Sequence, residues 1–166
     1  MDLTLSRRGD YVVRAAIHLA RNWNGKGGYS KIRDVASTMD LPSSYTPQLL
    51  GVLAKAGLAE ARAGRTGGYR LTRDPSSITV LEVIEAAEGD LISRRCTMRG
   101  GPCHWDNVCA MHPTWVAASE AIRSTLSRTS LADVASVDRR LAEGEVVDET
   151  PSGDRARGGH LPVASG

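Results

Sequence analysis

The fold is decided by residues 46–71, which read TPQLLGVLAKAGLAEARAGRTGGYRL. Their first part predicts a helix over residues 46–56, with Thr46 as its cap and Pro47 in its first turn. The leucines and alanines that follow recur at helical spacing and can pack inward on one face. Gly57 suits the position just beyond a helix end, because it adopts left-handed backbone angles without strain.

A β-hairpin is predicted directly after this helix. Residues 58–62 and 68–71 are two short segments that flank the glycine-rich, basic stretch 63–67. Glycines supply the backbone angles that a tight connection between strands needs. We therefore expect a hairpin with a basic tip.

Two further helices are predicted upstream. Residues 6–23 carry apolar side chains at helical spacing and begin at Ser6, a good N-cap. A second helix follows Ser30, which we expect to cap it, and ends before a turn at residues 40–43. Three helices, a short turn between the second and the third, and a following hairpin are typical of a winged helix-turn-helix.

The second half of the chain predicts more helix and one irregular region. Residues 79–88 read as a fourth helix, Pro113 can open a long fifth helix, and residues 131–137 can add one or two turns. Residues 89–111 hold all three cysteines and show no clear periodicity.

The expected fold is mainly α with a small β-hairpin wing and a long C-terminal helix. We expect a winged helix-turn-helix domain over residues 1–75 and a cysteine loop with a long helix over 76–137. From Asp138 the composition turns to Asp, Glu, Gly, Pro, Ser and Arg, so residues 138–166 are expected to be a disordered tail.

The charge is distributed unevenly along the chain. Residues 1–73 hold 12 Lys and Arg against 5 Asp and Glu, a balance of +7, whereas the remainder has a balance of −5. A basic first half attracts a phosphate backbone. The chain has no 18-residue apolar run and begins Met1-Asp2-Leu3-Thr4 without a signal pattern, so we expect it in the cytosol.

The residues predicted to contact DNA lie near the start of the third helix and in the hairpin. They are Ser43, Ser44, Tyr45, Thr46, Gln48, Arg62, Arg65 and Arg70. Hydroxyl and amide groups at the start of a recognition helix can donate to and accept from base edges. An arginine at a glycine-rich tip, such as Arg65, can enter a narrow minor groove.

The three cysteines, Cys96, Cys103 and Cys109, lie close together in the sequence and precede His112. Three thiols in a cytosolic chain are unsuited to a disulfide framework, and their spacing differs from that of paired zinc knuckles. Three thiolates leave an iron–sulfur cluster one ligand short, which is the chemistry of a sensor with an exchangeable site. A structural zinc and a thiol redox switch are the alternatives.

Several motifs occur in an order that resembles the Rrf-two (Rrf2) family of bacterial regulators, to which IscR-, NsrR- and RirA-like proteins belong. They are LT at 3–4, RGDY at 8–11, LPSSY at 41–45, QLL at 48–50, KAGL at 55–58, GGYRL at 67–71 and ITVLEVI at 78–84. The resemblance covers residues 1–137. It implies a homodimer that binds a near-palindromic DNA operator, in which the long helices from residue 113 to about 127 cross.

The resemblance also implies that Cys96, Cys103 and Cys109 ligate a [2Fe–2S] or [4Fe–4S] cluster. IscR-like members take a fourth ligand from a histidine three residues after the last cysteine, where His112 stands. NsrR-like members take it from an aspartate in the first helix of the partner subunit, where Asp10 stands. Both candidates are present, so this choice stays open.

The chain departs from the family at Pro47, where IscR-like proteins carry a base-contacting glutamate, and at Ala63, where the family often has glycine. The operator sequence therefore cannot be carried over. We expect a transcription regulator, a repressor, whose cluster senses nitric oxide, redox state or iron supply. A redox enzyme is the rival from another class, but no nucleotide-binding fingerprint and no acid–base constellation is recognisable in the sequence.

Overall fold

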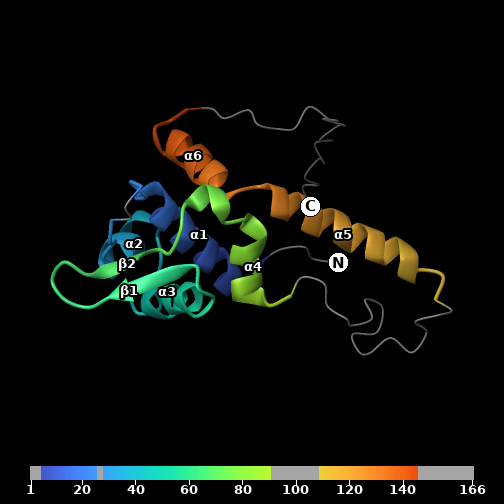
Figure 1. The fold of residues 1–166 in the computed structure, drawn as a ribbon, viewed down its shortest axis with the longest axis horizontal. Coiled ribbons are helices and arrows are strands. Elements are labelled where there is room, and N and C mark those ends of the chain that lie inside the picture. The colour runs from blue at the N-terminus through green and yellow to red at the C-terminus, as the bar shows by residue number, and fades with distance from the viewer. Residues whose placement is uncertain (1–4, 26–27, 91–108, 146–166) are drawn as a thin grey trace, which may run out of the picture.

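The computed structural model describes residues 5–25, 28–90 and 109–145. Within these ranges the chain forms helices α1 (Arg7–Arg21), α2 (Ile32–Thr38), α3 (Thr46–Lys55), α4 (Val80–Glu88), α5 (His112–Arg128) and α6 (Leu131–Ala142). Strands β1 (Ala59–Arg62) and β2 (Gly68–Leu71) follow α3, and a short 3₁₀ helix, η1 (Pro75–Ser77), precedes α4. The predicted fold class, mainly helical with a small hairpin, is confirmed (Figure 1).

Helix α1 is the centre of the fold, because α2, α3, α4 and α6 all contact it. Its inward face is made of small and branched apolar side chains, which let the neighbouring helices approach closely; Val12, Ala15 and Ala16 are completely buried. The Ser6 hydroxyl accepts a hydrogen bond of 3.1 Å from the Gly9 N–H, as expected of an N-cap. The predicted first helix is therefore confirmed.

The end of α3 turns the chain into the hairpin through a Schellman motif. Gly57 has a φ of +73°, in the left-handed region. The Leu58 N–H donates to the Leu53 carbonyl at 2.9 Å and the Gly57 N–H donates to the Ala54 carbonyl at 3.0 Å. Leu58 and Leu53 are both buried, which adds the apolar contact common in this motif. The predicted role of Gly57 is confirmed.

Strands β1 and β2 pair antiparallel, with Ala59 opposite Leu71 and Arg62 opposite Gly68. We call the hairpin of residues 59–71 the wing, and residues 63–67 the wing tip. The segment before α2 adds to the wing through a bridge between Ser30 and Tyr69. Figure 1 shows the wing tip extending beyond the group of helices.

Helix α4 starts at a complete capping box. The Glu82 N–H donates to the Thr79 hydroxyl at 3.1 Å, and the Thr79 N–H donates to the Glu82 carboxylate at 2.8 Å. Leu81, Val83 and Ile84 are buried, so this helix closes the core beside α1. Val80, the first residue of this helix, is only half-buried.

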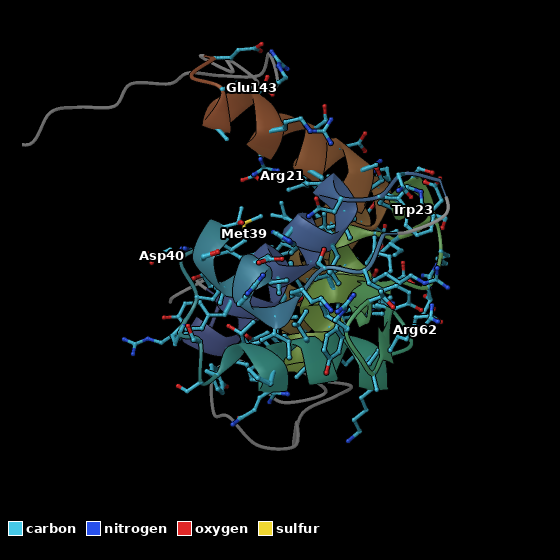
Figure 2. The ribbon with its side chains drawn as sticks, turned by 90° about the vertical axis from the view of Figure 1, so that its left-hand side faces the viewer. Arg21, Trp23, Met39, Asp40, Arg62 and Glu143 are labelled. Carbon is cyan, nitrogen blue, oxygen red and sulfur yellow. The ribbon has the colours of Figure 1, made fainter. Side chains whose placement is uncertain are left out.

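Helix α5 projects from the body that α1–α4 form, and α6 returns to it (Figure 1). Among the described residues α5 is joined to α4 by the Arg123–Glu85 ion pair at 2.7 Å. Helix α6 packs on α1, where Arg21 and Asp138 form an ion pair of 2.9 Å. Figure 2 shows Arg21 at this junction.

Two predicted caps are wrong. Ser30 does not cap α2, whose N-cap is Lys31 without a side-chain hydrogen bond, because the Ser30 backbone pairs with Tyr69 instead. Thr46 does not cap α3 but is its first residue, since the turn before it is already helical at Tyr45. The Thr46 hydroxyl donates to the Pro42 carbonyl at 2.9 Å.

The predicted boundary of a disordered tail at Asp138 is also wrong. Helix α6 continues to Ala142, because the ion pair of Asp138 with Arg21 and the packing on α1 extend it beyond the apolar pattern. Residues 146–166 lie outside the described residues. In the described ranges no helix is both long and apolar enough to cross a membrane.

Candidate nucleic-acid interface

The turn between α2 and α3 sets the angle of a helix-turn-helix. Asp40 has a φ of +52°, which Asp tolerates better than most side chains because it can hydrogen-bond locally. The Leu41 N–H donates to the Ala36 carbonyl at 2.9 Å and so ends α2. Figure 2 shows Asp40 at the outer edge of the molecule and Met39 beside it, of which Met39 is buried.

The start of α3 presents polar groups to solvent. Ser43, Ser44 and Gln48 are exposed, as is Pro47 between them. The helix carries these groups on its outer side because Leu49, Leu50 and Leu53 occupy its inner side. An exposed helix start with hydroxyl and amide groups can enter a major groove and reach base edges.

Two predicted contact residues lie deeper than expected. Thr46 is completely buried and its hydroxyl is bonded to Pro42, so its side chain does not reach the surface available to DNA. Tyr45 is half-buried and meets Tyr11 edge to face, with ring centroids 6.4 Å apart. Tyr45 keeps part of its ring at the surface, beside Ser44.

Gly51 lies in the middle of α3, one turn after Gln48. Within the described chain nothing lies within 4 Å of a Cβ built on Gly51, and its φ is not positive. A glycine inside a helix costs about 1 kcal/mol relative to alanine. Among the described residues, neither backbone conformation nor a close neighbour requires a glycine at this position.

Arg65 is the single arginine of the wing tip. Its side chain is exposed, and no ion pair or hydrogen bond of its guanidinium is seen in the described part of the chain. Its backbone carbonyl accepts a hydrogen bond from the Lys31 ammonium at 2.5 Å. The backbone of the tip is therefore held by Lys31, while the guanidinium of Arg65 remains exposed to solvent.

Arg70 differs, because its guanidinium is already occupied within the wing. It forms an ion pair of 2.6 Å with Glu60, its partner across the hairpin, and lies 4.7 Å from the centre of the Tyr29 ring. The hydrogen bond from Arg70, followed by that from the Tyr29 hydroxyl, lowers the pKa of Glu60. Arg62 is exposed and lies 5.9 Å from the same ring. Arg62 and Arg65 are thus better placed than Arg70 to meet phosphates.

The proposed metal ligands are only partly described. Cys109 is half-buried just before α5, and its carbonyl accepts a hydrogen bond of 3.1 Å from the N–H of His112, the exposed first residue of α5. Cys96 and Cys103 lie outside the described residues. Among described residues no group of three His, Cys, Asp or Glu side chains gathers that could hold a metal ion.

Asp10 lies on α1, in a different part of the fold from the start of α5 (Figure 1). Its carboxylate accepts a hydrogen bond of 3.0 Å from Arg14 and is less than half exposed. Within one chain Asp10 therefore does not share a site with Cys109 and His112.

The residues that hold the wing in place, Tyr29, Lys31 and Glu60, are not among those predicted from the sequence. Gly51 is not among them either. Gly51 could have been recognised from the sequence, since it is a glycine on the outer face of a helix where Gln48 and Lys55 are polar. Tyr29 and Lys31 gave no such signal, because they meet the wing only in three dimensions.

A helix-turn-helix with a polar outer helix, followed by a basic hairpin, defines a winged-helix DNA-binding protein. Residues 5–136 match the Rrf2 family, described as iron-dependent transcriptional regulator, and the chain belongs to this family. It is therefore a transcription regulator of this type, and its relatives are regulators rather than enzymes.

Relatives and solved structures agree with this assignment. The transcriptional regulator IscR of Klebsiella pneumoniae is 33% identical over 132 residues, which cover 80% of this chain and 79% of IscR. CymR, the global cysteine regulator of B. subtilis, superposes with a TM-score of 0.67 at 29% identity, over 82% of this chain and 98% of CymR. IscR of T. potens gives a TM-score of 0.65 at 28% identity, over 89% and 94%.

Proposed function

We propose that the protein is a homodimeric repressor whose affinity for its operator is controlled by an iron–sulfur cluster. The first half of this proposal, binding to DNA, is based on α3 and the wing. The observation that carries it is the exposure of Ser43, Ser44 and Gln48 on α3 together with that of Arg65 on the wing tip. The helix would read the major groove and the tip would enter the neighbouring minor groove.

Replacement of Arg65 by Ala tests this part. The operator is first identified by selection from random duplex DNA, and affinities are then measured at one fixed salt concentration. We expect Arg65→Ala to weaken binding by about 10- to 100-fold, since a specific arginine contact contributes on the order of 1–3 kcal/mol. Arg128→Ala, at the exposed end of α5, is the matched control. Equal affinity of the Arg65→Ala variant and the wild type would exclude the wing from DNA contact.

The cluster is proposed on Cys96, Cys103 and Cys109. Thiolate sulfur is the usual protein ligand of such clusters, and Cys109 is partly accessible beside His112. The description of the family as iron-dependent supports iron over zinc. When bound, the cluster would supply a redox-active centre with one ligand that a signal can displace. The three cysteines would hold the cluster, in the part of the sequence between α4 and α5.

Anaerobic purification followed by absorption spectroscopy and by iron and sulfide analysis tests the cluster. We expect visible absorption bands together with stoichiometric iron and sulfide, and their loss in Cys109→Ser. Zinc without sulfide after anaerobic reconstitution would contradict the proposal. The fourth ligand is tested by comparing the spectra of Asp10→Ala and His112→Ala, of which one should change the cluster and the other should not.

A thiol switch is the second candidate, and the similarity to CymR of Staphylococcus aureus, whose structure is known in an oxidized form, favours it. In that case the purified protein would hold no metal. Its operator affinity would instead change on oxidation by peroxide and return on reduction by a dithiol. Retention of iron and sulfide on the cysteines would exclude this alternative.

A further inference from the structure

The segment between α1 and α2 is built onto the wing. The Ser30 N–H donates to the Tyr69 carbonyl at 2.8 Å, and the Tyr69 N–H donates to the Ser30 carbonyl at 2.9 Å. A Cβ on Gly68 would lie 2.2 Å from the Ser30 carbonyl oxygen, and Gly68 has a φ of +145°. The glycine is thus required for this close approach. The wing is paired on one side by a segment that leads directly into the helix-turn-helix.

The base of the wing is held by Tyr29 from the same segment. The Tyr29 hydroxyl donates to the Glu60 carboxylate at 3.1 Å, and the guanidinium of Arg70 lies over the Tyr29 ring at 4.7 Å. Glu60 in turn forms the ion pair with Arg70. A stacked, ion-paired arginine restrains both strands at this level.

The wing tip is held by Lys31, the residue that precedes α2. Its ammonium donates to the Arg65 carbonyl at 2.5 Å and to the Gly64 carbonyl at 3.4 Å. Gly64 has a φ of +99°, so the chain reverses at a residue with wide conformational freedom. A loop of this kind loses entropy when DNA orders it, unless a contact in the free protein has already ordered it.

We propose that Lys31 is a positioning residue of the DNA site: it ties the wing tip to the start of α2 and so presents Arg65 at a fixed place relative to α3. The inference rests on the proposed DNA-binding role of the wing. Lys31 acts through the backbone of Arg65 and does not contribute its charge to a phosphate. Its side chain does not cap α2, so its replacement leaves the helix start unchanged.

A double-mutant cycle tests the proposal on operator affinity. Lys31→Met keeps the length of the side chain and removes the donor. We expect it to weaken binding about tenfold in the wild-type background and less than about twofold in Arg65→Ala, because residues that act as a unit are not additive. Lys31→Arg, which retains a donor, should recover most of the affinity. Equal losses in both backgrounds would mean that Lys31 contacts phosphate directly, and would overturn the proposal.

A measurement without DNA separates this inference from the proposed function. Amide hydrogen exchange over residues 63–67 should be faster in Lys31→Met than in the wild type. In the control Lys55→Met, which changes a lysine at the end of α3, exchange in the tip should be unchanged. Unaltered exchange in Lys31→Met would overturn the anchoring role even if the protein binds its operator. Faster exchange in a protein that binds no DNA would instead contradict the proposed function alone.

Discussion

Gly51 is a single residue whose identity the chain itself does not explain. It lies on the same side of α3 as Gln48 and Lys55, which are three and four positions away. The space around its Cβ position is open within the described residues. If α3 enters a groove as proposed, a glycine here would let the backbone approach the DNA closely, which would explain a residue that otherwise costs helix stability.

Replacement of Gly51 by leucine should therefore separate stability from binding. We expect the free energy of unfolding to rise by about 0.5–1 kcal/mol, since leucine is a better helix former than glycine. The affinity for the operator should fall more than about tenfold, because the added side chain would keep α3 out of the groove. Thermal unfolding and a binding titration measure the two effects. A variant that binds as well as the wild type would remove Gly51 from the interface.

His18 is the buried titratable residue of α1, and its Nδ1 has no hydrogen-bond partner within the described residues. Its Nε2 lies 2.9 Å from the Asn22 amide. Burial, and then the nearby charge of Arg21, lower the pKa of His18 below its ordinary value of 6.5. At pH values between this lowered pKa and 6.5, the imidazole is therefore mainly neutral in the folded chain and mainly protonated in the unfolded chain.

The stability of the fold should consequently fall in mild acid. Below about pH 6.5 the unfolded state binds a proton that the folded state does not, so stability decreases from there down to the lowered pKa of the folded state. His18→Gln should flatten this part of the curve of unfolding free energy against pH. The same slope between pH 6.5 and 5 in both proteins would assign the acid sensitivity to other groups.

At the scale of elements, the junction of α3 and β1 depends on Gly57. Its left-handed backbone allows both hydrogen bonds of the Schellman motif, and the direction of β1 follows from them. Because the wing continues from β1, a change at this junction alters the position of the wing relative to α3.

Gly57→Ala should therefore destabilise the fold by about 1–2 kcal/mol, the cost of a left-handed residue with a Cβ. The matched control is Gly51→Ala, a glycine-to-alanine change inside α3 at a residue without positive φ, which should stabilise by about 1 kcal/mol. Chemical denaturation of both variants measures the difference. Changes of the same sign in the two variants would contradict the assignment of backbone strain to Gly57.

In the molecule as a whole, α5 stands out as a helix that contacts α4 but buries none of its side chains against the described residues. None of its residues is buried in the described part of the chain, and Met111, Val116 and Ile122 are 52%, 45% and 41% exposed. Met111, Ala118 and Ile122 share one side of the helix with the half-buried Trp115 and Leu126. A second α5 crossing this side would cover it, which supports the proposed dimer.

Ile122→Glu should convert the dimer to a monomer. Operator binding should then weaken strongly, because the two DNA-binding domains would no longer bind the two half-sites together. Light scattering coupled to size-exclusion chromatography measures the mass. The control is Ser124→Glu, which places the same charge on the opposite side of α5 and should leave the dimer intact. A wild-type protein that is monomeric at micromolar concentration would contradict the proposal.

Much of the fold could be predicted from local patterns. Two local features, the apolar periodicity of α1, α3 and α4 and the glycine at the end of α3, can be recognised in the sequence because each depends on residues only a few positions apart. The length of α6 could not be predicted in this way, because Asp138 forms an ion pair with Arg21, which lies far away in the sequence. The same reason applies to Ser30, whose backbone pairs with Tyr69 across the fold.

The class of protein, the exposure of Ser43, Ser44 and Gln48, and the place of Arg65 at a basic tip could all be predicted from the amino-acid pattern. Which of the other candidate residues can reach DNA depends on contacts between distant parts of the fold. Thr46 is buried because the helix starts one residue earlier than its capping chemistry suggests. Arg70 is occupied because the hairpin register sets it opposite Glu60, and a tyrosine from before α2 completes that contact. Pairing across strands and between distant segments depends on register and packing, which no local pattern of residues contains.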